Sequence, residues 1–212
     1  MKHNILETIY HRLFTAYGPQ HWWPGDSPFE MAVGAILTQN TNWLNVEKAI
    51  KNLKHTRALS TKALDAMPAA ELSGHIRPVG YYNIKAKRLK NLVNFLMEEY
   101  QGSMKKMAKE NQTVIRQKLL FVNGIGPETA DSIILYALEK PVFVIDAYTK
   151  RILSRHTILR HDASYETYQK LFHQKLRRDV SRFNEYHALM VRLAKDFCRP
   201  KPRCSGCPLE RI

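Results

Sequence analysis

Apolar residues recur at helical spacing along almost the whole chain, whereas strand-like alternation of apolar and polar residues is scarce. One short run, Pro141–Ile145, is rich in β-branched residues, and no second strand-like run lies near it. We therefore interpret this run as an extended, buried connector. The sequence predicts an all-α fold, with helices expected over Phe29–Leu37, Leu44–Leu53, Ile84–Tyr100, Val114–Phe121, Glu128–Leu138, Ala147–Leu153, Tyr165–Leu176 and Phe183–Phe197.

Proline and glycine residues interrupt the helical pattern at short intervals, and no low-complexity linker or internal repeat separates the helices. These breaks predict a globule of two helical lobes that are joined by short loops. A cleft between two such lobes is a common place for a small ligand or an extruded group. The interruptions fall at Pro24 with Gly25, Pro68, Pro78 with Gly80, Gly102, Gly124 with Gly126 and Pro127, Pro141, Pro200, Pro202 and Pro208.

The charge balance indicates what kind of partner the chain binds. There are 33 Lys and Arg residues against 19 Asp and Glu residues, which gives a net charge of +14. The excess is concentrated in the C-terminal third. Such a surplus favours a polyanionic partner and argues against a neutral scaffold.

Neither a membrane span nor an export signal is apparent in the sequence. No run of about 18 apolar residues is present, and Met1–Phe14 has the pattern of an amphipathic helix rather than that of a signal peptide. We expect a monomer in the cytoplasm, associated with the nucleoid if the source is prokaryotic. Three cysteines clustered within Cys198–Cys207 therefore favour metal ligation over disulfides.

A glycine-rich turn lies between two helical patterns within Leu119–Ala130. Gly124 and Gly126 permit a close approach of the backbone to a ligand, Ile125 is placed to enter the core, and Pro127 suits the first position of a helix. Backbone amides at such a turn, with a helix N-terminus behind them, suit one DNA phosphate without regard to sequence. The alternative is an ordinary connection between helices.

Asp146 follows the buried run and precedes the helix expected from Ala147. A carboxylate at this position caps a helix, which is a favoured use of aspartate. The same carboxylate, kept ionised by the helix N-terminus, is suited to stabilising positive charge on a sugar. The two roles are compatible.

Four motifs in order resemble those of the endonuclease III superfamily of DNA glycosylases. Leu120–Ala130 followed by Val144–Asp146 is similar to its helix-hairpin-helix and Gly/Pro-Asp signature. Gly34–Thr41 and Val79–Ala86 look like its two DNA-probing loops, and Cys198–Cys207 looks like its cluster loop. The resemblance covers nearly the whole chain.

This resemblance implies a helix-hairpin-helix DNA glycosylase fold and a partner, double-stranded DNA that contains a damaged base. It implies a six-helix domain over 25–135 that contains the hairpin. A second helical domain, formed by 1–24 and 136–212, carries Asp146 and the cysteine loop.

The resemblance departs from the bifunctional members of the superfamily at Glu128. Those members carry a nucleophilic lysine at this position, and a carboxylate forms no Schiff base. The implied enzyme is monofunctional: water attacks the sugar and an abasic site remains. Asp146 is then the catalytic residue, which stabilises the oxocarbenium-like transition state and orients or deprotonates the water.

All three tryptophans gather where the resemblance places the base pocket, which Trp22, Trp23, Pro24 and Trp43 would form. Tryptophans at such positions are also ordinary core residues. Electron-rich faces attract cations, and an N-alkylated purine such as 3-methyladenine carries positive charge. Trp-Trp-Pro together with Glu128 is similar to the endonuclease III-type 3-methyladenine DNA glycosylases.

The resemblance also supplies residues that open the duplex, because a stacked base must be flipped before its excision. Gln39 matches the glutamine that fills the gap, and Tyr81 matches the opposing wedge, with Tyr82 as the alternative wedge. A solvated glutamine and a core tyrosine are the alternatives to these roles. The basic run Lys85–Lys90 is expected either to touch phosphates or to form a solvated face.

Phosphate binding by the hairpin is expected from Gly124, Gly126 and Thr129. Cys198, Cys204 and Cys207 resemble the superfamily's [4Fe-4S] loop, which uses four cysteines. The fourth would directly follow Ile212. We expect a cluster in the natural protein and an incomplete ligand set in this chain, with zinc as the alternative.

Two other functions stay open from the sequence. One is a glycosylase for uracil or thymine in mismatches, or for oxidised pyrimidines. The other is a non-catalytic helix-hairpin-helix protein that only grips DNA, which predicts no released base and no dependence on Asp146.

Overall fold

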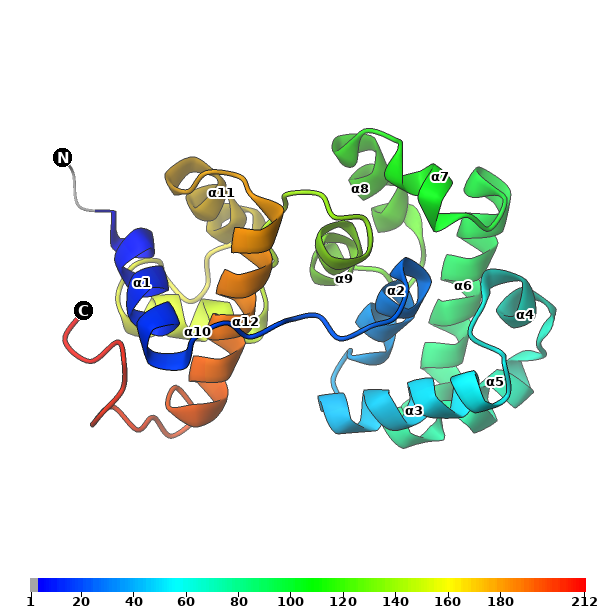
Figure 1. Ribbon diagram of the computed structural model, residues 1–212, viewed down its shortest axis with the longest axis horizontal. Helices are drawn as coiled ribbons and strands as arrows, with labels where there is room; N and C mark the ends of the chain where they lie inside the picture. Colours follow the sequence, from blue (N-terminus) through cyan, green and yellow to red (C-terminus); the bar gives the residue numbers. More distant parts are fainter. Residues whose placement is uncertain (1–3) are drawn as a thin grey trace. The chain divides into compact units, whose positions relative to one another are not determined.

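The computed structural model describes residues 4–212 and contains two compact units (Figure 1). Unit 1 combines Met1–Trp23, described from Asn4 onward, with Pro141–Ile212. Unit 2 is the continuous segment Pro24–Lys140. Unit 1 is therefore assembled from two segments that are distant in sequence, and unit 2 is inserted between them.

The all-α prediction is confirmed: every regular element within residues 4–212 is helical, and this part of the chain contains no strand. Unit 1 contains α1 (Ile5–Tyr17), α10 (Ala147–Arg155), α11 (Tyr165–Lys175) and α12 (Val180–Asp196). Unit 2 contains α2 (Pro28–Leu37), α3 (Trp43–His55), α4 (Thr61–Ala66), α5 (Ala69–His75), η1 (Arg77–Val79), α6 (Tyr82–Tyr100), α7 (Met104–Ala108), α8 (Gln112–Phe121), α9 (Pro127–Ser132) and η2 (Ile133–Ala137).

Side-chain caps set where most of these helices begin. A capping oxygen accepts a hydrogen bond from a free amide of the first turn, which stabilises the helix by about 1 kcal/mol. Ser27 does so for α2, with Pro28 as the first helical residue. The same capping bond is made by Asn4, Asn42, Ser60, Ser103, Asn111, Asp146, Ser164 and Asp179.

The helix expected over Glu128–Leu138 is present but changes its winding. After α9 the chain continues into the π-helical turn η2, where the amide of Leu138 donates to the carbonyl of Ile133 at 3.1 Å. The bond spans five residues instead of the usual four. The sequence pattern did not separate this wider turn from an α-helix.

The run Pro141–Ile145 is extended and buried in unit 1, as the sequence predicted. Side chains of α11 bond its backbone in place of a neighbouring strand. The Phe143 amide donates to His173 Nε2 at 3.0 Å, and Gln169 Nε2 donates to the Phe143 carbonyl at 2.8 Å. The Ile145 amide donates to the Tyr165 hydroxyl at 3.2 Å. These bonds satisfy polar backbone groups that burial would otherwise leave without water.

Aromatic rings form the centre of unit 1. Phe143 stacks on Phe172 with 3.6 Å between ring centroids and meets Phe183 and Tyr186 edge-on at 5.3 and 5.6 Å. The Tyr186 hydroxyl donates to the carbonyl of Leu6 at 2.9 Å. The last bond ties α12 to α1, so the two sequence segments of unit 1 share one core.

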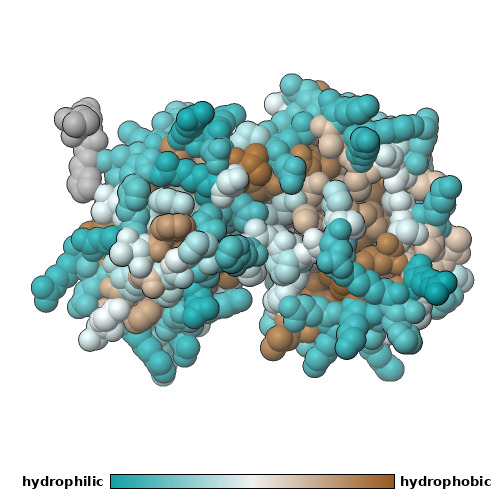
Figure 2. Space-filling view, in the orientation of Figure 1, coloured by the Kyte–Doolittle hydropathy of each residue, from teal (hydrophilic) through white to brown (hydrophobic). Residues whose placement is uncertain are grey.

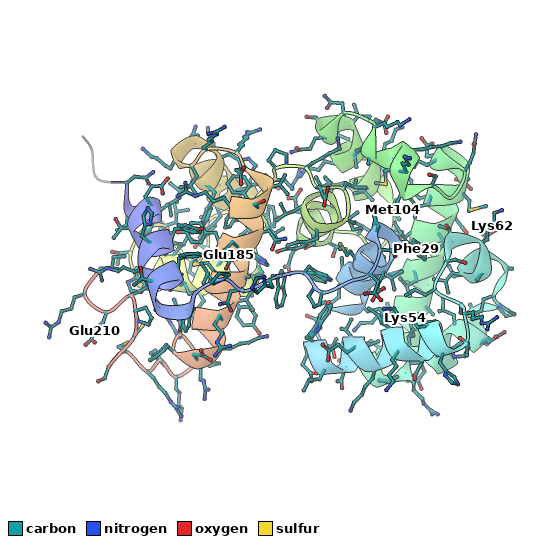
Figure 3. All side chains as sticks on the ribbon, in the orientation of Figure 1. Phe29, Lys54, Lys62, Met104, Glu185 and Glu210 are labelled. Carbon is teal, nitrogen blue, oxygen red and sulfur yellow. The ribbon has the colours of Figure 1, made fainter. Side chains whose placement is uncertain are left out.

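Helix α2 lies at the centre of unit 2 and packs against α3, α6, α9 and η2 (Figure 1). Nearly all of its side chains are buried, including the carboxylate of Glu30. Lys54, labelled in Figure 3, extends from α3 toward α2. Its Nζ lies 2.7 Å from Asp26 and 2.7 Å from Glu30, which gives the buried carboxylate its counter-charge.

Hydrophilic residues cover most of the face seen in Figure 2, with apolar patches over unit 2. Within that unit, Leu120 and Phe121 at the end of α8 are exposed, and Phe121 is 90% exposed. None of the helices in the described part of the chain combines the length and apolar character needed to cross a bilayer.

Candidate active site

The predicted hairpin is present between α8 and α9 in unit 2. Gly124 has a φ of 95°, a value that favours glycine, and Ile125 is buried at 5% exposure. Pro127 is the first residue of α9. The Ile125 amide donates to the Val122 carbonyl at 3.0 Å, so this amide closes the turn and is not among those directed at an anion.

Gly124 also leaves room for the side chain of Arg88, which crosses the hairpin from α6. A Cβ atom at residue 124 would lie 2.3 Å from Arg88 Cγ. The guanidinium donates to Gln39 Oε1. A glycine is therefore required here for its φ and for the passage of Arg88.

Replacing Gly124 by Ala should destabilise unit 2 by about 1–3 kcal/mol, because the new Cβ is strained and displaces Arg88. Urea unfolding measures this loss. Gly126→Ala is the matched control, since Gly126 has a φ of −92° and open space around a new Cβ. Equal stability of the two variants would contradict the role given to Gly124.

Gln39 contacts the hairpin rather than only solvent. Its Nε2 donates to the Gly124 carbonyl at 3.0 Å and to Thr129 Oγ1 at 2.9 Å. Because Arg88 donates to Oε1 of Gln39, both the nitrogen and the oxygen of this amide are hydrogen-bonded. The structure therefore brings Gln39, expected to enter the duplex, together with Gly124 and Thr129, both expected to bind phosphate.

Tyr81 and Tyr82 differ clearly in exposure. Tyr81 is 72% exposed and has left-handed backbone angles, with a φ of 45° and a ψ of 31°. Tyr82 is half-buried, and the guanidinium of Arg77 lies 5.7 Å from its ring centroid. Of the two, Tyr81 is the ring available to enter a base stack.

The basic run that follows is not a uniform surface face. Lys85 is 1% exposed, and Lys90 donates to the carbonyls of Leu64, Asp65 and Met67 at the end of α4. The expectation that the run presents its cations to phosphates or solvent is wrong for Lys85. Helical spacing places Lys85 and Arg88 on the inner side of α6, and residue type alone does not reveal that side.

Asp146 is the N-cap of α10 in unit 1 and is 9% exposed. Its Oδ1 accepts the amide of Thr149 at 2.7 Å, and its Oδ2 lies 3.4 Å from Nε2 of His187 on α12. Burial raises the pKa of Asp146, but the facing His187 and the bonds from Thr149 outweigh it and hold that pKa below its ordinary value. The carboxylate is therefore ionised at neutral pH.

His187 is the residue of this site that sequence reasoning missed. It lies 41 positions after Asp146 and is only 5% exposed. A single histidine within the apolar pattern of α12 gives no local signal of a partner. Only the packing of α10 against α12 brings it to the carboxylate.

The tryptophans are divided between the two units. Trp22 and Trp23 belong to unit 1, where their rings meet edge-on with 5.6 Å between centroids. The amide of Gln20, two residues before Trp22, donates to Glu185 of α12 at 2.8 Å. Trp43 begins α3 in unit 2 and donates to Glu47 at 2.6 Å. A base pocket formed by all three stays a prediction, as does the part of Pro24.

Glu128 is exposed in the first turn of α9, directly after Pro127. An acidic side chain is favourable there because the helix N-terminus carries partial positive charge. The residue is thus suited to its place in the fold without a catalytic function.

Arginines of α10 bind the cysteine loop. Arg151 donates to the Cys198 carbonyl at 2.7 Å, and Arg155 donates to the carbonyls of Arg199 and Pro200 at 2.6 and 2.8 Å. Cys198 is buried, Cys207 is half-buried and Cys204 is exposed.

These cysteines do not fit the cofactors expected from the sequence. Across residues 4–212, no group of three or more His, Cys, Asp or Glu side chains is arranged to hold a metal ion. The sequence has three cysteines, and a [4Fe-4S] cluster takes four. Neither a cluster nor zinc is supported by this arrangement of the described residues.

Comparisons with known proteins cover most of the chain. A family model described as HhH-GPD superfamily base excision DNA repair protein matches residues 33–178. A Methanocaldococcus jannaschii protein, whose name assigns it provisionally to the DNA repair glycosylases, is 46% identical over 213 residues and is covered over 96% of its length. Endonuclease III of Bacillus subtilis is 26% identical over 184 residues, which are 86% of this chain and 79% of that protein.

Two solved structures have the same fold. The H. pylori 3-methyladenine DNA glycosylase MagIII, bound to 1,N6-ethenoadenine, matches with a TM-score of 0.77 and 28% identity over 90% of this chain and 95% of that chain. An endonuclease III–DNA complex matches with a TM-score of 0.83 and 22% identity, over 99% of this chain and 94% of that chain. The family model and the relatives agree with the hairpin and the aspartate that follows it. The chain therefore belongs to the HhH-GPD superfamily of base excision DNA repair proteins and is a DNA glycosylase.

Proposed function

We propose that this glycosylase is monofunctional and removes an N-alkylated purine, such as 3-methyladenine, from double-stranded DNA to leave an abasic site. The observation that carries the proposal is the buried, ionised Asp146 combined with a glutamate at residue 128. The likeness to a 3-methyladenine DNA glycosylase at 28% identity supports the substrate class.

Asp146 acts on the sugar of the extruded nucleotide. The N-glycosidic bond breaks as the base leaves with the bonding electrons, and C1′ gains positive charge. The carboxylate stabilises this charge while Thr149 and His187 hold its two oxygens in place. Water forms the new bond to C1′, and its proton passes to Asp146 and then to solvent.

Glu128 explains why the reaction ends at the abasic site. A carboxylate cannot attack C1′ as an amine does to form an imine, and only the imine route leads to strand cleavage by this position. Water is left as the nucleophile. The residue keeps a structural function at the first turn of α9.

An N-alkylated purine suits a site with one carboxylate. The base is cationic before cleavage and neutral after it departs, so it leaves without a separate general acid. Its charge also favours a position against the electron-rich face of a tryptophan ring. This preference is what separates the alkylated base from normal adenine in our proposal.

Gln39 and Tyr81 open the duplex in this proposal. Tyr81 is exposed and ready to enter the stack. Gln39 exchanges the bonds of its amide to the hairpin and Arg88 for bonds to DNA, and so replaces the lost hydrogen bonds of the base pair. Gly124, Gly126 and Thr129 bind a backbone phosphate near the lesion. The monomeric state and the cytoplasmic or nucleoid location stay predictions.

One assay tests both parts of the proposal. Duplex DNA that contains 3-methyladenine is incubated with the enzyme, the free base is measured by chromatography, and the strands are analysed with and without alkali. We expect free methyladenine, with strand breaks only after alkali. Strand breaks without alkali would overturn the monofunctional assignment.

Parallel duplexes with uracil or thymine in mismatches and with oxidised pyrimidines test the substrate class. Release of one of these bases in preference to methyladenine would replace the alkylated base as the substrate. If the protein binds DNA but releases no base from any of these duplexes, the alternative function, a non-catalytic DNA-binding protein, would replace the proposal.

A further inference from the structure

Lys85 is a buried cation that the reaction described above does not use. It lies on α6, is 1% exposed, and is among the largest fully buried side chains of the described residues. Its Nζ donates to the carbonyl of Leu37 at 2.9 Å and to the carbonyl of Val79 at 3.0 Å. No carboxylate within residues 4–212 forms an ion pair with it.

The positions of the two carbonyls give this contact its meaning. Leu37 is the last residue of α2, two residues before Gln39. Val79 is the last residue of η1, two residues before Tyr81. One ammonium group therefore bonds the backbone at the start of both loops, in each case two residues before the side chain expected to enter DNA.

Stability alone does not account for a lysine at this position. Burial of a charge that is bonded only to neutral carbonyls is unfavourable, and an apolar side chain of similar volume would fill the same space at lower cost. The ammonium group offers what such a side chain lacks, namely two directed bonds from one atom. Those bonds fix the distance between the ends of α2 and η1, where the two loops begin.

We propose that Lys85 is a positioning residue that sets the spacing of the Gln39 loop and the Tyr81 loop, so that both side chains enter the duplex at one lesion. The inference rests on the proposed parts of Gln39 and Tyr81 in opening DNA. Arg88, one turn further along α6, holds the Gln39 amide itself. Lys85 thus places the loop backbones, and Arg88 places one of the side chains.

The two bonds from Lys85 to the loop backbones depend on pH. Burial, assisted by the positive charge of Arg88, lowers the pKa of Lys85 to about 8. Arg88 is the charged group that acts on Lys85 among the described residues. Above that pH the neutral amine still has two N–H donors, but it loses the positive charge that strengthens its bonds to the Leu37 and Val79 carbonyls.

Stability should not fall in the same pH range. The pKa of Lys85 is lower in the folded chain than in the unfolded chain, so between about 8 and the ordinary value of 10.5 the unfolded chain binds more protons. This group therefore makes the folded state more stable as pH rises through the window. A loss of loop spacing is thereby separable from unfolding.

The test compares Lys85→Met with Lys105→Met, an exposed lysine of the same unit. Base release is measured from a methyladenine duplex and from the same strand without its complement, which needs no opening. We expect Lys85→Met to lower release from the duplex by about tenfold or more, with release from the single strand and the control variant nearly unchanged. Equal losses on both substrates would overturn the proposal.

Two further measurements keep the proposal testable if Lys85→Met folds poorly or the substrate is another base. In the unaltered protein, the ratio of duplex to single-strand release should fall as pH rises through about 8, while the melting temperature does not fall with it. The fluorescence of 2-aminopurine beside a tetrahydrofuran abasic-site analogue reports loop entry without chemistry. A ratio and a fluorescence signal that stay constant across this pH range would overturn the proposal, whatever base is excised.

Discussion

Asp146→Asn should lower the rate of base release by about 10²- to 10³-fold or more, because the amide cannot offer the negative charge that stabilises the sugar cation. The substitution is favourable for such a test. Asparagine caps helices as well as aspartate does, so α10 should keep its first turn. Single-turnover release of methyladenine from a duplex measures the effect.

DNA affinity and the melting temperature of Asp146→Asn should stay close to those of the unaltered protein. A rate within about threefold of the original would show that Asp146 is not the residue that stabilises the transition state. A large fall in melting temperature would instead indicate that the carboxylate serves the fold.

The acid side of the pH–rate profile gives a second check on Asp146. Its folded pKa lies below the ordinary 3.8, so the ionised form persists until the pH falls below that value. The free energy of unfolding changes in the same direction: the stability that Asp146 contributes is present above its unfolded pKa and is lost as pH falls through the folded pKa. A rate that already declines near pH 5 or 6 must reflect a group other than Asp146.

Asp131→Ala should destabilise unit 2 by about 3–5 kcal/mol, because it leaves Arg116 without its buried partner. Asp131 on α9 is fully buried, and its carboxylate accepts two bonds from Arg116 on α8, at 2.7 and 3.1 Å. This pair connects the two helices on either side of the hairpin. Urea unfolding and binding to an abasic-site duplex should both show the loss.

Asp26→Ala is the control for this prediction, since Asp26 is an 85% exposed partner of Lys54 in the same unit. Its loss should cost about 1 kcal/mol or less. Replacing both members of the buried pair, as Arg116→Met with Asp131→Leu, should recover much of the stability. If Asp131→Ala proved no more destabilising than Asp26→Ala, the pair would not be what holds the hairpin helices together.

Local features of the chain were predictable from the sequence. Apolar spacing gave the long helices, and the glycines with Pro127 gave the hairpin, because these signals depend on near neighbours in sequence. The cap formed by Asp146 was expected for the same reason. The short helices α4, α5 and α7 did not stand out, since fewer than two turns establish no periodicity.

Features that depend on tertiary packing were not predictable. His187 meets Asp146 only because α12 packs on α10, and Lys85 is buried although a lysine in a basic run usually faces water. The bonds of Gln39 to the hairpin likewise join residues 85 and 90 positions apart. In each case the deciding partner lies far away in sequence, beyond the reach of any local pattern.

Unit 1 is built from the beginning and the end of the described chain, and this has a consequence for biosynthesis. Helix α1 leaves the ribosome before unit 2, but α12, which holds α1 through the bond from Tyr186 to Leu6, is translated after unit 2. The apolar side of α1 must wait without its partner while all of unit 2 is made. Unit 2, a continuous segment, is free to fold during that interval, so its completion precedes the closure of unit 1 in the order of translation.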